Sequence, residues 1–142
     1  MKRRSHMFYL MATIPLLLVV GYPVESNVAD EWRIRVVDVD GKAVSGVVVR
    51  QFWQHYSLEG NSHEEERLTD SSGRVVFPRR TIRASLIWRL MGPAWKVMQL
   101  GVHASFGPSS DAIAFTEGYE GSGRWEGKDS TIVLKPVRYP SR

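Results

Sequence analysis

The sequence predicts an all-β sandwich with a partly helical insertion around residues 79–100. Three observations lead to this fold class. Most of the chain is divided into short segments rich in β-branched and aromatic residues, which favour strands. Glycine, proline, aspartate and serine separate these segments, as they do in turns. One interval instead has apolar residues at helical spacing.

The first two predicted strands lie on either side of a short turn. Residues 31–39 begin with every second side chain apolar, from Trp32 to Val36, which is typical of a half-buried strand. An aspartate-glycine pair then predicts a turn. Residues 46–58 predict a long strand with apolar residues on both faces. Either a bulge switches its faces midway, or another segment covers its outer face.

Further strands are predicted on both sides of the insertion. Residues 63–69 predict a polar edge strand, and residues 74–77 predict the strand that follows it. Residues 130–137 predict a closing strand that two prolines bring to an end. The glycine-rich stretch 118–129 predicts a loop with one short strand around Arg124-Trp125.

The stretch TDSSGRVVFPRR, residues 69–80, could be a reactive loop or the corner of a hairpin. Asp70 can accept hydrogen bonds from the following backbone amides, and Gly73 can supply a positive φ. A serine nucleophile at Ser71 or Ser72 would need a histidine base nearby, and this segment holds none. We therefore interpret the stretch as a turn.

The insertion begins with a helical pattern. Residues 83–91 predict a helix, which Gly92-Pro93 should end, and residues 94–100 predict a second short helix or a strand. We expect the insertion to pack on the sandwich and to cover the long strand at residues 46–58. Residues 107–111, GPSSD, then predict a hairpin turn.

The first 26 residues have the pattern of an export signal. Three basic residues precede an uncharged apolar run at residues 7–22, and Val24 and Ser26 suit a cleavage site, with Ala29 as a second option. An uncleaved membrane anchor is the alternative, although sixteen residues form a helix of only about 24 Å. We expect residues 1–26 to be a signal peptide or an N-terminal membrane anchor.

Composition excludes several classes of site. The chain has no cysteine, so disulfides, thiolate metal sites and cysteine nucleophiles are excluded. Removing residues 1–26 takes away three basic residues and one acidic residue, so the net charge falls from +4 to +2. This charge is too small to indicate nucleic-acid binding. An exported domain without cysteine is typical of a bacterial envelope, so we expect a periplasmic or secreted protein, or one anchored in the inner membrane.

Several short patterns together resemble a known family. A strand that ends in Asp40-Gly41, the turn 69–73 leading into Val75-Phe77-Pro78, the segment AFTEGY at residues 114–119 and the closing strand form this pattern. It resembles the carboxypeptidase regulatory-like domain, a transthyretin-like (prealbumin-like, Ig-like) β-sandwich of exported bacterial proteins. The resemblance implies such a domain at residues 30–139, and it implies an accessory, non-catalytic role.

Two enzyme groups with transthyretin-like folds do not fit the sequence. Hydroxyisourate hydrolase ends in a Tyr-Arg-Gly-Ser type tail, which residues 138–142 do not match. The intradiol dioxygenase core requires an iron site with a close His-x-His pair, and this sequence has none. His55, His63 and Glu65 could meet across a hairpin as metal ligands, but we favour a solvated edge strand here. We therefore predict no enzyme activity, no metal and no cofactor.

Five tryptophans offer the remaining candidate binding residues. Trp32 and Trp53 are expected in the core, while Trp88 and Trp95 should hold the insertion on the sheet. In the glycine-rich loop, Tyr119 and Trp125 could stack on a sugar or, alternatively, close the end of the sandwich.

We therefore expect a non-catalytic envelope module with a protein-interaction or structural role, which would meet a protein partner through the edge strand at residues 63–69 or through the surface of the insertion. The alternative is a carbohydrate- or small-ligand-binding module that uses the loop around Tyr119 and Trp125. We expect no nucleic-acid partner, and membrane contact only if the signal segment stays uncleaved.

Overall fold

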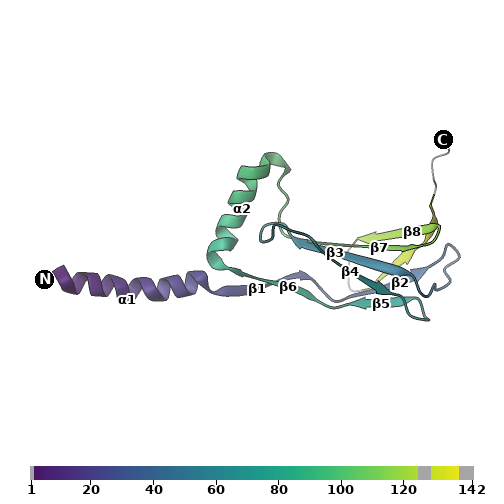
Figure 1. The fold of residues 1–142 in the computed structure, drawn as a ribbon, viewed down its shortest axis with the longest axis horizontal. Coiled ribbons are helices and arrows are strands. Elements are labelled where there is room, and N and C mark those ends of the chain that lie inside the picture. The colour runs from purple at the N-terminus through teal and green to yellow at the C-terminus, as the bar shows by residue number, and fades with distance from the viewer. Residues whose placement is uncertain (1, 125–128, 138–142) are drawn as a thin grey trace.

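The computed structural model describes residues 2–124 and 129–137. Over these residues the chain forms a β-sandwich with a partly helical insertion, as the sequence predicts (Figure 1). One layer is a five-stranded sheet and the other is a three-stranded sheet. A separate two-stranded sheet forms an arm between the sandwich and the N-terminal helix.

The five-stranded sheet is antiparallel at every pairing. Its strands, in spatial order, are β10 (Lys135–Pro136), β8 (Tyr119–Arg124), β7 (Pro108–Thr116), β3 (Val48–His55) and β4 (His63–Leu68). Strand β4 lies at one edge and is mostly exposed, so the predicted polar edge strand is confirmed.

The three-stranded sheet joins segments that are distant in the sequence. Its strands, in spatial order, are β5 (Arg74–Phe77), β2 (Trp32–Val37) and β9 (Asp129–Val133). The central strand β2 pairs antiparallel with β5 and parallel with β9. The last long strand of the chain is therefore placed beside the first strand of the sandwich.

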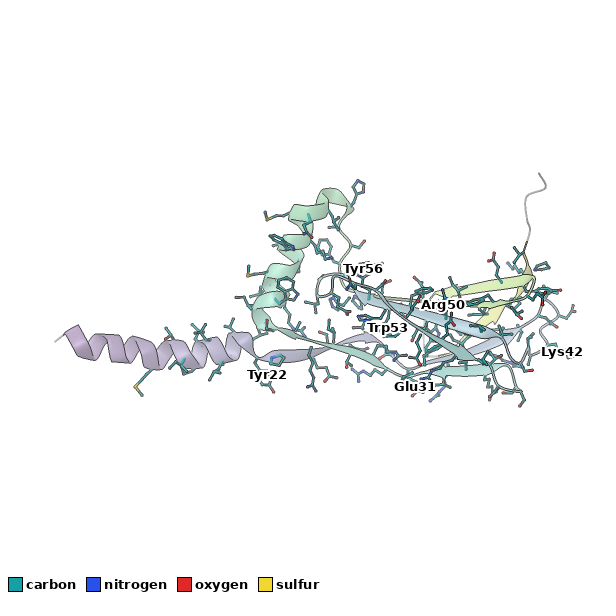
Figure 2. The ribbon with its side chains drawn as sticks, in the orientation of Figure 1. Tyr22, Glu31, Lys42, Arg50, Trp53 and Tyr56 are labelled. Atoms are coloured by element: carbon teal, nitrogen blue, oxygen red, sulfur yellow. The ribbon has the colours of Figure 1, made fainter. Side chains whose placement is uncertain are left out.

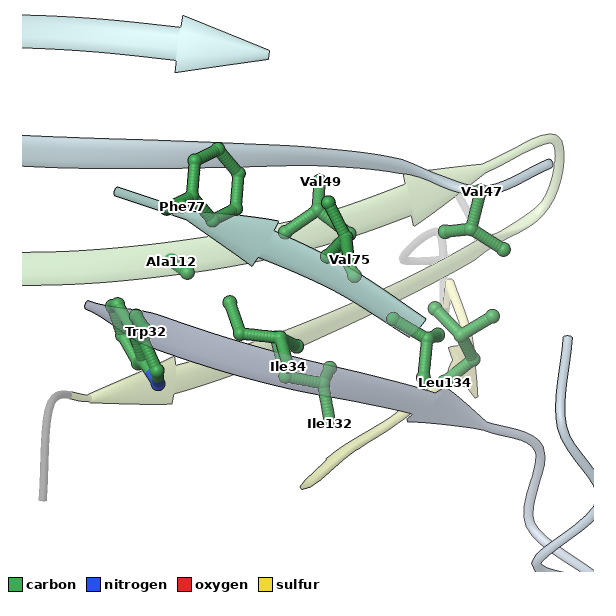
Figure 3. Close-up of a cluster of buried hydrophobic side chains, with 11 residues drawn as sticks. Trp32, Ile34, Val47, Val49, Val75, Phe77, Ala112, Ile132 and Leu134 are labelled. Carbon is green, nitrogen blue, oxygen red and sulfur yellow. The ribbon is translucent and has the colours of Figure 1, made fainter. Parts of the chain in front are cut away.

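The core lies between these two sheets (Figure 3). Its buried members are Trp32, Ile34, Val36, Val47, Val49, Val75, Phe77, Ala112, Ala114, Ile132 and Leu134. The indole Nε1 of Trp32 donates a hydrogen bond of 2.9 Å to Ser130 Oγ, which satisfies its polar group inside the core. The alternation predicted for the first strand therefore places its apolar face inward.

The N-terminal part of the chain forms a helix followed by the arm. Helix α1 (Lys2–Gly21) continues through Pro15, and β1 (Pro23–Ala29) pairs antiparallel with β6 (Arg80–Ser85). Residues 1–26, the predicted signal segment, thus include α1 and the first part of β1. Among the helices in the described ranges, none combines the length and the apolar character that crossing a membrane requires.

The insertion differs from its prediction in two respects. Helix α2 (Leu86–Leu100) continues through Gly92-Pro93, where we expected it to end, and a short 3₁₀ helix, η1 (Gly101–His103), follows. Residues 80–85 form β6 of the arm. The insertion therefore consists of one strand and one uninterrupted helix, and the helix stands apart from both sheets (Figure 1).

The predicted turn at GPSSD is wrong, because β7 begins at Pro108 and its first residue pairs with His55. Proline fits the first position of a strand, where no amide donor is needed. Gly107, with a φ of 78°, makes the bend that precedes the strand. The expected loop at residues 118–129 is also partly a strand, since β8 extends to Arg124.

The outer face of β3 is covered by an arginine. The Arg50 guanidinium lies 5.4 Å from the ring centre of Phe115 and 5.9 Å from that of Phe52. At the end of the strand, the Arg80 guanidinium of β6 lies 4.2 Å from the ring centre of Trp53. The insertion therefore covers Trp53 through β6, and α2 does not cover β3 as we expected.

Candidate binding surface

Helix α2 has one polar stripe, and the rest of its surface is apolar. Polar or small residues recur at intervals of four and three, so they lie on one side of the helix. They are Ser85, Arg89, Gly92, Lys96 and Gln99. Ser85 also begins the helix, because its hydroxyl accepts a hydrogen bond from the backbone N–H of Trp88.

The polar stripe faces the body of the protein. Gly92 is buried, and a Cβ atom added to it would lie 2.3 Å from the carbonyl oxygen of Ser57. One turn earlier, the indole Nε1 of Trp88 donates a hydrogen bond of 3.2 Å to the carbonyl oxygen of Leu58. The helix therefore lies against the turn after β3 with its least apolar side.

Arg89 fixes α2 to the arm. Its Nε donates to the carbonyl oxygen of Ala84 at 3.3 Å, and its Nη2 donates to the carbonyl oxygen of Val24 at 2.6 Å. These two acceptors belong to the two strands of the arm. A lysine could not reach both acceptors with one planar group, so the guanidinium sets the angle between helix and arm.

The apolar residues of α2 point away from the body, and Figure 2 shows the helix apart from both sheets with side chains projecting around it. Leu90 and Met98, on the side opposite Gly92, are each 79% exposed. We call the exposed apolar side chains of this helix the α2 face. They are Leu86, Ile87, Trp88, Leu90, Met91, Trp95, Val97, Met98 and Leu100.

The orientation of α2 is the reverse of that of an ordinary surface helix. Helices on soluble domains turn the apolar stripe inward and the polar residues toward water. Contiguous exposed apolar patches usually mark a surface that binds a protein or a membrane. Trp88 and Trp95, which we expected to hold the insertion on the sheet, are 44% and 52% exposed. Trp88 donates a hydrogen bond to the body, yet both indole rings remain exposed, so the α2 face is a candidate binding surface.

Gly92 provides a test of how α2 is held. We expect Gly92→Ala to loosen the helix, because the added Cβ atom would clash with the carbonyl oxygen of Ser57 and push the helix outward. The typical cost of such overpacking is about 1–3 kcal/mol. The gain in helix propensity, about 1 kcal/mol, offsets only part of this cost. Amide hydrogen exchange across α2 should accelerate by roughly fivefold, since a net loss near 1 kcal/mol changes an opening equilibrium by that factor.

A matched variant on the exposed side of the helix is the control for this experiment. Ala94→Leu adds a larger group at an exposed position and keeps a strong helix former, so exchange across α2 should stay close to that of the unmodified chain. Equal exchange rates for Gly92→Ala and the unmodified chain would show that the contact with Ser57 does not hold the helix.

Of the two residues predicted to bind a sugar, the structure describes one. Tyr119 begins β8, is 46% exposed, and pairs with Thr116 and Pro136. Trp125 lies outside the described residues. An open groove of about 950 Å³ lies beside this strand, and its lining does not include Tyr119. The groove is lined by Val39, Ile113, Glu120, Gly121, Thr131, Val133, Lys135 and Pro136.

The histidines and acids of β4 are engaged with other partners. The His63 ring stacks on Trp53 with the ring centres 5.6 Å apart, and its Nε2 contacts the Glu59 carboxylate. Burial is the main cause that lowers the pKa of His55 below its ordinary value. Within residues 2–124 and 129–137, no group of three or more histidines and acids lies in position to hold a metal.

Glu65 lies between two cations. Its carboxylate binds Arg67 at 2.6 Å and contacts Arg80 through the other oxygen. The hydrogen bonds from Arg67 and Arg80 hold the pKa of Glu65 below its usual range. The same Arg80 covers Trp53, so this group of charges fastens β4 to the arm.

Residues 69–73 form a turn, as predicted, although it joins β4 of one sheet to β5 of the other and is therefore not the corner of a hairpin. Asp70 Oδ1 accepts hydrogen bonds from the backbone amides of Ser72 at 2.8 Å and Arg74 at 2.9 Å. The Ser72 hydroxyl donates to the same oxygen at 2.7 Å. The hydrogen bond from the Arg74 amide, followed by that from the Ser72 hydroxyl, lowers the pKa of Asp70. Gly73 has a φ of 71°, and the segment continues directly into β5.

The sequence analysis named the insertion as one of two possible partner surfaces, but it did not predict that a single helix exposes its apolar side there. The signal was present in the spacing of the polar stripe, which runs without a break from Ser85 to Gln99 through the glycine-proline pair. A helix that ended at Gly92 would have had no reason to keep the same stripe beyond it. The continuity of this pattern therefore predicts a single helix more strongly than the proline predicts its end.

Comparisons with known proteins find a distant structural similarity. No family model and no curated protein sequence matches the chain. Among solved structures, the chain is similar to the crystal structure of 3-chlorocatechol 1,2-dioxygenase from Rhodococcus opacus 1CP, with a TM-score of 0.47 and 20% sequence identity. The match covers 80% of this chain and 62% of that chain, so this chain spans about three fifths of the dioxygenase's length. A likeness this distant carries no argument about activity.

Proposed function

We propose that this chain is a non-catalytic binding module of the bacterial envelope that docks through the α2 face. One observation carries the proposal, namely that nine large apolar side chains of a single helix are between 38% and 79% exposed. The polar stripe of that helix is turned toward the protein, so the exposed face is available to a partner. The resemblance to carboxypeptidase regulatory-like domains supports an accessory role of this kind.

The engagement of the polar side chains supports a role without catalysis. Asp70 is used by its turn, and Glu65 is held between two arginines. His63 is stacked on Trp53 and contacts Glu59. These groups stabilise strands and turns, and a general base would instead be directed at a site where a substrate can lie.

We also propose that residues 1–26 stay attached to the exported chain. Cleavage after Ser26 would remove four of the paired residues that hold β6, from Pro23 opposite Ser85 to Ser26 opposite Ile82. It would also remove the carbonyl oxygen of Val24, to which Arg89 donates. Both losses would release α2 from its present angle, so an intact start supports the binding surface.

The absence of cysteine gives a direct test of the docking surface. In a Met98→Cys variant of the full chain, the new thiol should react with a water-soluble maleimide at least about tenfold more slowly in the native envelope than in detergent-purified protein. This ratio is expected when about nine tenths of the copies are docked and docking shields the thiol. Mass spectrometry of the same sample reads the N-terminus.

Two further single-cysteine variants are the controls. Lys42→Cys lies at the opposite end of the sandwich, and it should react equally fast in both states (Figure 2). Tyr119→Cys reports on the alternative glycan- or small-ligand-binding function. Protection at position 119 with free reaction at position 98 would contradict docking through α2 and favour that alternative.

A further inference from the structure

We propose that the occupant of the α2 face is an anionic lipid surface, with α2 lying in the plane of the membrane interface. This inference rests on the proposed function and names the partner of the same surface. It commits to a lipid bilayer as the occupant, and an envelope protein is an outcome of the test described below.

The length of α2 is suited to lying on a membrane. At about 1.5 Å per residue, its 15 residues span about 22 Å, which is shorter than a hydrocarbon core of about 30 Å. An interfacial helix instead buries one apolar side in the boundary between headgroups and acyl chains. Leu90 and Met98, the most exposed residues of α2, lie on the side opposite the polar stripe and would enter this boundary first.

The two tryptophans of the α2 face are suited to the boundary between headgroups and acyl chains. Tryptophan is enriched at the membrane–water interface, where the apolar ring contacts lipid and the indole N–H remains in a polar environment. Trp88 is 44% exposed, and its N–H is already satisfied by the carbonyl oxygen of Leu58. Trp95, two turns along the helix, is 52% exposed. The Trp88 N–H therefore needs no new polar partner, and the exposed Trp95 would keep its N–H among the headgroups.

The charge around α2 favours anionic lipids. Three of the six basic residues in 71–110 lie on α2 or near the end of β6 beside it, namely Arg83, Arg89 and Lys96, and this interval holds no aspartate or glutamate. Glu25 lies 3.5 Å from Arg83 and offsets its charge. Arg89 and Lys96 therefore carry the net positive charge of the helix itself. Basic residues near a bilayer attract its anionic headgroups.

The positions of α1 and α2 agree with a contact of both helices with one membrane surface. In Figure 1, α2 lies crosswise to α1 at the point where α1 meets the arm. The last turns of α1 also expose apolar side chains, with Leu17 and Leu18 each 69% exposed. Both helices therefore present apolar groups at the same end of the molecule, and the sandwich extends away from them.

The test uses the full chain as Met98→Cys, with an environment-sensitive fluorophore on the thiol. The protein is reconstituted into vesicles of phosphatidylglycerol and phosphatidylethanolamine, and into vesicles of phosphatidylcholine alone. We expect quenching by lipid-attached nitroxide and protection from aqueous iodide in the anionic vesicles. A fluorophore at Lys42→Cys should show the opposite behaviour in the same vesicles, because Lys42 lies at the far end of the sandwich.

A charge variant tests the electrostatic part of the proposal. Lys96→Gln in the Met98→Cys background should lower the binding constant of the labelled helix for anionic vesicles by about fivefold. This is the effect of removing one basic residue near such a surface. High salt should also lower the binding constant of the chain that keeps Lys96. Equal lipid quenching in zwitterionic and anionic vesicles would overturn the preference for anionic lipids.

Accessibility of position 98 in vesicles and in the native envelope distinguishes this inference from the proposed function. A label at position 98 that stays accessible to iodide in both kinds of vesicle would overturn lipid docking. If the same position is nevertheless protected in the native envelope, the docking surface stands and its occupant is a protein. Free reaction at position 98 in both settings would overturn the binding surface itself.

Discussion

Replacing Trp32 with alanine should lower the free energy of unfolding by about 3–5 kcal/mol, the usual cost of truncating a buried aromatic residue. Trp32 is fully buried and is the largest side chain of the cluster between the two sheets. The change also leaves Ser130 Oγ without the indole N–H that donates to it. Because small domains are stable by only about 5–15 kcal/mol, a large part of the stability should be lost.

Chemical denaturation followed by near-ultraviolet circular dichroism measures this loss. The control is the same substitution at Trp95, which is 52% exposed and has no part in the core. We expect Trp95→Ala to change the free energy of unfolding by no more than about 0.5 kcal/mol in detergent solution. Similar losses in the two variants would show that the sandwich core does not depend on Trp32.

Gly73→Ala should destabilise the sandwich by about 3 kcal/mol, for two reasons that add. Its φ of 71° is a left-handed conformation that costs an alanine about 1–2 kcal/mol. A Cβ atom would also lie 2.7 Å from the carbonyl oxygen of Val36 and 3.1 Å from the Cβ of Ala43, an overpacked contact that costs about 1–3 kcal/mol. Thermal and chemical denaturation both measure the change.

Gly41→Ala separates these two causes. Gly41 has a similar φ of 80°, but a Cβ atom added to it would meet nothing within 4 Å. We expect this variant to lose only the backbone part, about 1–2 kcal/mol. If the two variants lose equal stability, the close approach of Gly73 to β2 has no energetic effect.

The strands of the sandwich could be predicted because their signal is local. Alternation from Trp32 to Val36 identifies both the strand and its buried face. The charged residues of β4 identify it as an edge strand, and its place in the sheet order agrees. The turn at Asp70 could be predicted for the same reason, since its hydrogen bonds involve amides two to four residues away.

The arm could not be predicted, because a strand of this kind is defined by its partner. Residues 23–29 combine a proline, an acid and an asparagine, which are poor strand formers. They adopt an extended conformation because β6 is available more than 50 residues later, and the apolar Val28 and Ala29 are buried where the arm meets the sandwich. Local propensity contains no information about such a pairing.

Helix α2 was only partly predicted, because two signals at Gly92-Pro93 compete. A proline inside a helix removes one backbone hydrogen bond and usually ends or kinks the helix. The helix continues because the spacing of its polar stripe is maintained on both sides, and because Gly92 allows close approach to Ser57. The candidate surface on this helix therefore depended on a contact with the turn after β3, which the sequence does not reveal.

The parallel pairing of β9 with β2 has a consequence for the order of folding. Trp32 and Ser130 are 98 positions apart, and Ile132 and Leu134 complete the same core. Contacts of such high sequence separation form late, because the long intervening loop must close first. The sandwich core cannot close before Ser130, Ile132 and Leu134 have been synthesised. The chain therefore completes its fold only after β9 has been made.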